Sequence, residues 1–563
     1  MAAESAGVAV TKPADVGFKR ELGLIGATWA SETSIIGSGW LFGALFAAQA
    51  VGGAAVLAWV IAGIMIIILA LCHAELGAMF PVSGGTARFP HFAFGSVAGI
   101  GFGFFSYMQA VTIAPIECFA FMQYASYYWP SIYDSTTKNV TGVGFILTII
   151  LMAVFVAVNF LAMRIFARVN NVITWWKVAV PVLAIIVLLT HWHTGNFTAG
   201  GAGFMPGGLK ALFGALPAAG IIFAYSGFEQ CDQLAGEIKN PGRNLPRAIV
   251  ISVLIGTAIY CLLQVAFIVA LPPSMVGHGL TSLVCPETGT CAPNIAELNA
   301  GPFAAVAVFA GLGWLAHILR IDAFVSPSGT GLIYTTGTSR VSYGLARNRY
   351  APQIFAKVSR NGIPWVGLIG AFLIGLLFLL PFPSWHSLVG LITGASVLMY
   401  AGAPLSLGAF RRQLPDADRP YRMQAAWFLA PAAFVVSDLL IYWSGFEVIW
   451  KLGIVLVIGY VLIGISMAFD PQRPPLDWKS AVWLPAWLIG MGLISWQGQY
   501  SGGGVAAPVN TGHIGFWWDM LIVAGFSLAI YYWAMYTRLP REETLLLVNR
   551  QAGEQELPEA PRH

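Results

Sequence analysis

The stretch Ile36-Gly37-Ser38-Gly39-Trp40 interrupts an apolar segment that is otherwise long enough to span a membrane. A second long apolar segment contains a similar interruption, Phe223-Ala224-Tyr225-Ser226-Gly227. Glycine-interrupted helices at corresponding places in two halves of a chain indicate a transport site, because unwound backbone at membrane depth is tolerated only beside a cavity. The alternative is glycine-mediated helix packing, but that usually follows a Gly-x-x-x-Gly spacing.

The chemistry of such a break favours a zwitterionic ligand. Unwinding exposes backbone N–H groups at the start of one half-helix, which attract a carboxylate, and carbonyl groups at the end of the other, which attract an ammonium group or a cation. An α-amino acid meets both needs at once. The predicted substrate-binding residues at the two breaks are Ile36, Gly37, Ser38, Gly39, Phe223, Ala224, Tyr225, Ser226 and Gly227.

The composition is that of a polytopic membrane protein. The chain has 563 residues, of which 57% are hydrophobic and 10% are charged, whereas soluble domains carry roughly 25% charged residues. Apolar runs predict about fourteen spanning helices. Their expected ranges are 22–52, 54–79, 97–128, 142–163, 169–190, 211–235, 248–271, 312–339, 364–382, 385–409, 425–445, 449–469, 480–497 and 514–536.

Basic residues are distributed unevenly between the two sides predicted by these spans. With the N-terminus inside, only Lys138, Lys210 and Lys451 fall on external connections, and only Lys177 and Arg320 fall within the membrane. All other lysines and arginines then lie on the cytoplasmic side. This distribution follows the positive-inside rule, so we expect a multi-pass protein with both termini in the cytoplasm.

Lys177 lies within the apolar run Ile173–Leu189, nine residues after Arg168. A helix would carry it roughly 13 Å from that end, which is near the middle of a hydrocarbon core about 30 Å thick. A charge at this depth is costly and usually marks a functional site inside a bundle. The alternative is a lysine that reaches back to the interface, but apolar residues flank Lys177 on both sides.

Several motifs together resemble the amino acid–polyamine–organocation superfamily of permeases. Ile36–Trp40 is similar to the loop that binds the substrate carboxylate in that family. Phe80–Gly85 resembles its Pro-x-Ser-Gly-Gly turn, and Gly236–Arg247 is similar to its loop after helix 6. The segment Thr86–Pro90 departs from much of the family and instead resembles the aspartate–proton symporters within it.

This resemblance implies an all-α fold of two inverted five-helix repeats in which helices 1 and 6 are broken. The corresponding expected parts are a tail at 1–20, repeats at 21–190 and 211–412, four further helices at 425–536, and a tail at 537–563. Both tails are expected to be cytoplasmic. The organism is expected to be a bacterium, with the protein in its inner membrane.

The resemblance also suggests roles for single residues. In proton-coupled relatives, a helix-5 lysine similar to Lys177 occupies the place of sodium in sodium-coupled ones. Desolvation favours the neutral form of an ammonium group, so protonated Lys177 is expected to hold helices 1 and 8 together and to release them when it loses its proton. The candidate hydroxyl partners on helix 8 are Ser326, Ser328 and Thr330.

Other side chains have alternative interpretations. Phe223 corresponds to an aromatic gate, with a lipid-facing ring as the alternative, and Glu229 to the acid that couples gate movement. Glu117, deep in helix 3, either binds the substrate ammonium group, relays the proton, or pairs with a neighbouring helix. Thr393 and Ser396 face the region where the family reads the substrate side chain, although such hydroxyls often bond their own helix.

Cysteines and charges outside the breaks are less specific. Cys285 and Cys291 share an external loop, where they are expected to form either a disulfide or two free thiols. Arg320 and Asp322, two residues apart, point to different faces of a helix and are not a natural pair.

The predicted function is proton-coupled import of an amino acid, with aspartate or another acidic amino acid as the substrate class. An amino-acid or polyamine exchanger is the main alternative. An intramembrane enzyme is disfavoured because the sequence contains no His-Glu-x-x-His or Gly-x-Ser-x-Gly motif, and a channel would not need paired broken helices. The expected partners are the substrate, the proton and the lipid bilayer, without cofactor, metal or nucleic acid. A homodimer with helices 11–14 at its interface is a further possibility.

Overall fold

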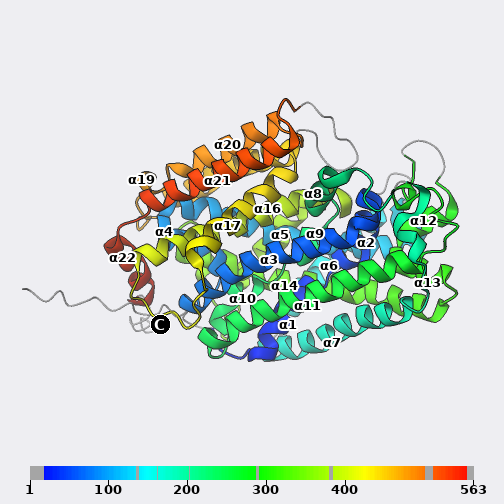
Figure 1. Cartoon of the computed structure of the whole chain (residues 1–563). Helices are drawn as coiled ribbons and strands as arrows, with labels where there is room; N and C mark the ends of the chain where they lie inside the picture. Colours follow the sequence, from blue (N-terminus) through cyan, green and yellow to red (C-terminus); the bar gives the residue numbers. More distant parts are fainter. Residues whose placement is uncertain are drawn as a thin grey trace, which may run out of the picture.

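The computed structural model describes residues 18–134, 139–160, 163–201, 203–286, 291–379, 385–500 and 512–553, and these are mainly helical (Figure 1). Residues 1–17 and 554–563 of the two predicted tails, and residues 380–382 of the predicted helix 364–382, lie outside these residues. One end of the bundle carries α22 (Arg541–Gly553), and the opposite end carries α12 (Pro293–Ala300) and α13 (Pro302–Phe309). We call these ends the terminal side and the loop side.

Both predicted helix breaks are present. The first span consists of α1 (Leu24–Ile35) and α2 (Ser38–Val51), and the sixth consists of α8 (Gly208–Ala218), α9 (Ile221–Tyr225) and α10 (Gln230–Gln233). Glycine is required on both sides of α9, because Gly220 and Gly227 have φ angles of 76° and 132°. A Cβ atom at Gly227 would also lie 2.7 Å from the backbone nitrogen of Ile35. The two breaks are therefore in direct contact.

The remaining helices complete two groups of five spans, followed by four more. In the first two groups they are α3 (Ala55–Met79), α4 (Gly85–Phe94), α5 (Ser96–Ala125), α6 (Gly142–Asn159), α7 (Met163–Leu188), α11 (Pro241–Ala270), α14 (Gly313–Arg347), α15 (Trp365–Leu379) and α16 (Trp385–Gln413). The C-terminal spans are formed by α17 (Ala426–Trp443), α18 (Phe446–Ala468), α19 (Trp478–Ala481), α20 (Trp483–Gln497) and α21 (Phe516–Thr537). This is the predicted fold class, a five-plus-five inverted-repeat bundle with additional helices.

Short elements fill the connections. A two-stranded antiparallel ribbon joins β1 (Tyr133–Asp134) to β2 (Asn139–Val140). The 3-10 segments are η1 (Gly52–Ala54), η2 (Pro130–Ile132), η3 (Thr194–Gly201), η4 (Ala235–Glu237), η5 (Leu280–Ser282) and η6 (Gln353–Ala356). The longest of them, η3, is kinked by non-helical residues at 198–200.

The helices differ from the predicted ranges in length and polarity. Within the described residues, nine helices are both long and apolar enough to cross a membrane. The breaks divide two of the predicted spans into short pieces, and the glycine, serine and threonine residues of Gly313–Arg347 lower the hydropathy of α14. The C-terminal tail also contains helix α22, which has no apolar run long enough to predict it.

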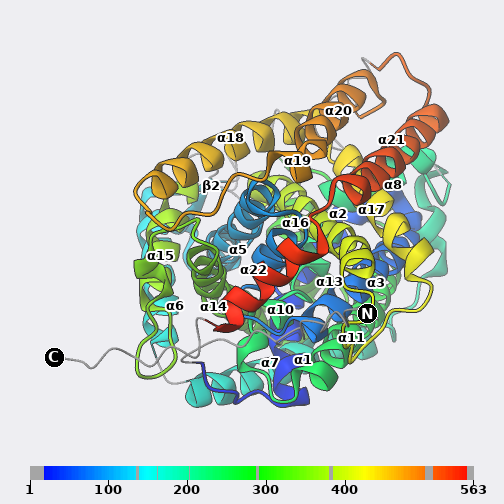
Figure 2. The same ribbon diagram turned by 90° about the vertical axis from the view of Figure 1, so that its left-hand side faces the viewer.

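The bundle has a buried centre and an apolar rim. Nearly all residues of α5 and α16 are buried, whereas α6, α18 and α21 expose many apolar side chains. Figure 2 shows α18, α20 and α21 along the outside of the bundle, next to α16 and α17. The interior of the bundle is therefore formed by the elements that surround the two breaks.

Contacts close the bundle on the terminal side. The backbone N–H of Leu22 donates to the carbonyl oxygen of Glu237 (3.0 Å), and the N–H of Lys239 donates to the carbonyl of Leu22 (2.7 Å). The buried guanidinium of Arg340 lies 2.6 Å from the carboxylate of Glu237. The segment before α1 is thus attached to the loop that follows the second break.

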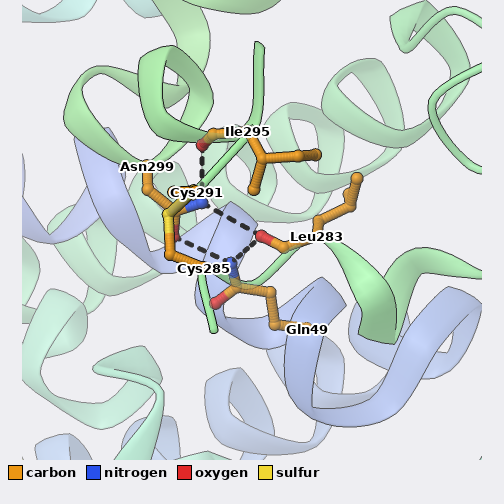
Figure 3. Close-up of a disulfide and its surroundings, with 6 residues drawn as sticks. All are labelled: Gln49, Leu283, Cys285, Cys291, Ile295 and Asn299. Carbon is orange, nitrogen blue, oxygen red and sulfur yellow. Dashed lines mark hydrogen bonds between the residues drawn. A yellow bond between two sulfur atoms is a disulfide. The ribbon is translucent and has the colours of Figure 1, made fainter. Parts of the chain in front are cut away.

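A disulfide lies on the loop side, where Cys285 and Cys291 are joined (Figure 3). Their loop is attached to the outer end of α2 by Gln49, whose side-chain amide donates to the carbonyl of Leu283 (2.6 Å) and to the side-chain oxygen of Asn299 (3.1 Å). The loop-side connection is therefore fixed to the half-helix that follows the first break.

The carboxylate of Glu75, at the terminal end of α3, holds the connection between α16 and α17. It is fully buried and accepts hydrogen bonds from Arg411 (2.6 Å), Arg419 (3.1 Å) and the backbone N–H of Met423 (2.7 Å). Breaking a buried pair by removing one partner leaves an uncompensated charge, which costs about 3 to 5 kcal/mol.

We therefore expect Glu75→Gln to destabilise the protein measurably. The apparent melting temperature of the purified protein in detergent should fall by at least about 2 °C, because the guanidinium of Arg419 remains buried without its counter-charge. Glu447→Gln is the matched control, since Glu447 pairs with Lys451 on the exposed surface, where such a pair contributes about 1 kcal/mol or less. Equal melting temperatures for the two variants would contradict this assignment.

Candidate functional site

A carboxylate from the protein itself occupies the N-terminus of α2 at the first break. The backbone N–H of Ser38 donates to Oε2 of Glu117 (2.9 Å), and the Ser38 hydroxyl donates to Oε1 (2.9 Å). The Ser38 hydroxyl in turn accepts a hydrogen bond from the indole of Trp385 (2.7 Å). Unpaired N–H groups at a helix start attract carboxyl groups, and in this conformation the carboxyl group of Glu117, on α5, occupies that position.

The second break is held in the same way by Glu229. Its Oε2 accepts hydrogen bonds from the backbone N–H of Gly227 (2.8 Å) and the hydroxyl of Tyr400 (3.0 Å). Its Oε1 accepts from the Gln109 amide (3.0 Å) and the Tyr334 hydroxyl (2.9 Å). Because these partners lie on α5, α14 and α16, Glu229 connects the second break to the buried centre of the bundle.

The carbonyl ends of the two breaks share one tyrosine. The hydroxyl of Tyr260, on α11, lies 2.6 Å from the carbonyl oxygen of Ile35 and 3.0 Å from that of Ala224. In contrast, Tyr225 turns toward α3, where its hydroxyl donates to the carbonyl of Trp59 (2.9 Å). Tyr260 was not among the residues predicted from the sequence, because it is distant from both glycine motifs along the chain.

Lys177 joins three helices at the level of the first break. It is fully buried, and its ammonium group donates to the carbonyl oxygen of Thr33 on α1 (2.5 Å) and to the Thr330 hydroxyl on α14 (2.8 Å). The Thr330 hydroxyl also donates to the Thr33 carbonyl (2.7 Å). Lys177 itself belongs to α7, so it connects α1, α7 and α14.

Only one of the three candidate hydroxyls on α14 therefore contacts Lys177. Ser326 donates to the carboxylate of Asp322 (2.8 Å), and half-buried Ser328 has no hydrogen bond within the described residues. Arg320 points elsewhere, with its guanidinium 3.6 Å from the centre of the Tyr127 ring. Arg320 and Asp322 do not form a pair, in agreement with the helical spacing.

The carboxyl groups of Glu32, Glu117 and Asp322 all lie close enough to Lys177 to interact with its charge. All three are fully buried, and neither side-chain oxygen of Glu32 has a hydrogen-bond partner in the described structure. Burying several carboxylates beside one ammonium group is prohibitively costly. The cluster must therefore carry protons in this conformation. Glu32 was not singled out from the sequence, although it is an acid within an apolar span.

The other predicted substrate-binding side chains contact a neighbouring ring or a carbonyl group of their own helix. Phe223 is buried against the edge of Trp385, with 5.7 Å between ring centres, so it does not face lipid. Ser226 lies at the second break, where its hydroxyl is 3.4 Å from the carbonyl of Ile222. Thr393 and Ser396 donate to the carbonyls of Val389 (2.7 Å) and Ile392 (2.8 Å), one turn earlier in α16.

A small cavity separates the two breaks. It measures about 10 Å³ and is lined by both breaks and by α5 and α14; its residues are Ser34, Ile35, Gly37, Gly39, Ile113, Glu117, Phe223, Ser226, Thr330 and Tyr334. This is about the volume that one water molecule requires. The site is thus closed, and an amino acid can enter only when these side chains separate.

The family of the protein follows from this arrangement and from its relatives. The model for the amino acid permease family matches residues 22–494. The chain belongs to the amino acid permease family. It is therefore a multi-pass membrane transporter for amino acids, of the amino acid–polyamine–organocation superfamily.

Relatives with established names cover nearly the whole chain. The glutamate/serine transporter AimA of Bacillus subtilis is 36% identical over 92% of this chain and 93% of its own length. The aspartate-proton symporter of the same organism is 34% identical over 93% of this chain and 98% of its own length. A mutant of the Eremococcus coleocola manganese transporter shares the fold, with a TM-score of 0.50 and 13% identity over 92% of this chain and 99% of that chain.

The tight contact between the breaks predicts a steric test. A Cβ atom at Gly39 would lie 2.7 Å from Cβ and 2.8 Å from Cα of Ala224, so Gly39→Ala should keep α2 and α9 apart. We expect uptake of a mixture of labelled amino acids into proteoliposomes to fall about tenfold, which corresponds to an overpacking cost of about 1 to 3 kcal/mol.

The control for this test is Gly464→Ala on α18, where a Cβ atom meets nothing within 4 Å. This variant should transport as the unaltered protein does. Both variants are compared at equal amounts of reconstituted protein. Full uptake by Gly39→Ala would show that the two breaks need not approach as closely as they do here.

Proposed function

We propose that this protein imports an acidic amino acid, with aspartate as the first candidate, by symport with protons. The observation that carries the proposal is the bridge made by the Lys177 ammonium group between Thr33 on α1 and Thr330 on α14. In the proposed setting the protein lies in a bacterial inner membrane, with both termini in the cytoplasm, and Glu229 and Phe223 act in closing the site.

The proposed role of Lys177 depends on its charge. A protonated amine makes charge-assisted hydrogen bonds that are roughly twice as strong as neutral ones. Loss of the proton weakens the attachment of α1 to α14 and allows the two helices to separate. The lysine resembles the helix-5 lysine that replaces sodium in proton-coupled relatives, and it is fully buried beside the first break.

The proposed role of Glu117 follows from its position on the α2 N-terminus. A substrate carboxylate would bind the same N–H and hydroxyl of Ser38 that Glu117 now occupies. Two carboxylates cannot share this site while both are ionised. Protonation of Glu117 weakens its hold on Ser38 and removes the repulsion, so one proton enters with each substrate carboxylate.

The substrate class is supported by the relatives and by this charge arrangement. The two Bacillus relatives are described as transporters of glutamate and serine and of aspartate with protons. A second, side-chain carboxylate would add another negative charge to a cluster that already contains Glu32, Glu117 and Asp322 beside Lys177. Accompanying protons would keep the net charge of this dry region small, which favours symport for an acidic substrate.

We expect reconstituted protein to take up labelled aspartate faster when the outside of the vesicle is more acidic than the inside. In Lys177→Met, this dependence on the gradient should disappear and uptake should fall at least about tenfold, because the methionine cannot bind Thr33 or Thr330. Lys451→Met is the control, since Lys451 lies on the exposed surface and should leave the gradient dependence intact.

Other outcomes would change the proposal. Saturable uptake that ignores the gradient but requires an amino acid inside the vesicle would identify an exchanger. Gradient-driven uptake of serine or glutamate without aspartate uptake would retain the coupling and correct the substrate. Gradient dependence that persists in Lys177→Met would remove Lys177 from the coupling step.

A separate prediction concerns Glu117 and substrate binding. For the unaltered protein in detergent, aspartate should bind about tenfold more tightly at pH 5.5 than at pH 7.5, because protonated Glu117 releases Ser38. Glu117→Gln mimics the protonated side chain, so its affinity should change little between these pH values. Equilibrium binding of labelled aspartate measures both, with exposed Glu447→Gln as the control. An unchanged pH dependence in Glu117→Gln would exclude this role.

A further inference from the structure

A large cavity lies on the terminal side, between the end of α3 and the beginning of α11. Its volume is about 880 Å³, far larger than the cavity between the breaks. Basic side chains line one part of it, and apolar side chains line the other. The residues used in this argument are Arg20, Arg243 and Arg247 on the basic part and Leu71, Val250 and Ile251 on the apolar part.

The basic part is suited to an anion. Arg20, Arg243 and Arg247 are exposed, and none of them forms an ion pair or side-chain hydrogen bond among the described residues. Within the part of the chain that the structure describes, no acidic residue lines this cavity. The first residues of α11, Asn240 to Gly242, also line it, so the positive end of that helix adds to the field of the arginines. Guanidinium groups bind phosphate through paired N–H donors.

The apolar part continues along two helices into the membrane-spanning region. On α3, the exposed residues Ile64 and Leu57 follow Leu71 at intervals of seven and therefore lie on the same face. On α11, Leu254 and Leu262 share the face of Ile251, and all three are exposed. The two helices pack side by side with opposite directions (Figure 1), so both apolar faces begin at the cavity.

We propose that this cavity binds the headgroup of an anionic phospholipid, whose acyl chains lie along α3 and α11. A lipid is favoured over a free anion because basic and apolar surfaces meet at one place, at the adjoining ends of two helices that are long and apolar enough to cross a membrane. Isolated arginines at such a boundary attract any anionic surface weakly. Here three arginines that have no partner among the described residues line one cavity, which favours one defined lipid.

The position of the lipid gives it a structural role. The cavity is lined by the start of α11, which follows the second break through α10 and η4, and by Pro420 and Tyr421. These two residues belong to the connection that Glu75 holds through Arg419 and Met423. A bound lipid therefore joins the loop after the second break to α3 and to the C-terminal helices, and it should stabilise the closed terminal side.

The test uses the full chain purified in a neutral detergent and titrated with phosphatidylglycerol or phosphatidylcholine, with bound lipids counted by native mass spectrometry. The variant carries Arg20→Gln, Arg243→Gln and Arg247→Gln. The matched control carries Lys357→Gln, Arg360→Gln and Arg473→Gln, which removes equal charge from exposed residues outside the cavity. We expect the first phosphatidylglycerol to bind at least tenfold more weakly to the variant than to the control, and phosphatidylcholine to show no difference.

A second variant keeps the arginines and changes the apolar wall. Ile251→Trp should fill the entry of the acyl chains and weaken phosphatidylglycerol binding, while leaving the charge of the cavity unchanged. Size-exclusion profiles show whether each variant is folded. Equal phosphatidylglycerol affinity in the arginine variant and the control would overturn the proposal. Competition by millimolar inorganic phosphate that removes the bound lipid, together with unaltered binding in Ile251→Trp, would assign the cavity to a free anion instead.

Discussion

The structure depends on how two unwound peptide segments are satisfied inside a bundle that excludes water. Ser38 is the first residue of α2, and Gly227 lies in the break between α9 and α10. Their N–H groups have no partner one turn earlier, and an unpaired buried N–H group is costly. Glu117 and Glu229 supply the missing acceptors. The same carboxylates hold α2 to α5 and the second break to α5, α14 and α16, so the polarity of the breaks determines which helices form the centre of the bundle.

The bundle that surrounds the breaks also buries an unusual number of ionisable groups near one lysine. The protein places one ammonium group, Lys177, among carboxyl groups from α1, α5 and α14. Not all of these acids can be ionised together in a dry interior, so the stability of the closed state depends on how many protons the cluster holds. Gain or loss of a single proton changes this balance, so the packing of the closed fold and the protonation of the cluster depend on each other.

Much of the fold could be predicted from the sequence because its signals are local. The Gly37-Ser38-Gly39 interruption, the apolar runs and the depth of Lys177 depend only on spacing along the chain. The partners of these groups could not be predicted, because they depend on how neighbouring helices rotate. Ser326, Ser328 and Thr330 are chemically alike on one helix, yet only Thr330 faces Lys177. Gln109, Tyr334 and Tyr400 converge on Glu229 from three helices and have no distinguishing motif.

The loop after the second break connects the central site with the terminal side. The loop begins at α10, and backbone hydrogen bonds of Leu22 join it to the segment before α1. Its residue Glu237 forms an ion pair with Arg340 of α14. Only a few residues separate α10, η4 and α11. Any movement of α9 and α10 that enlarges the 10 Å³ cavity must therefore also move this loop. Opening of the central site toward the terminal side therefore requires the buried Arg340–Glu237 pair to move as a unit or to separate. Separation would leave two buried charges without their partners, so the pair opposes opening toward the terminal side.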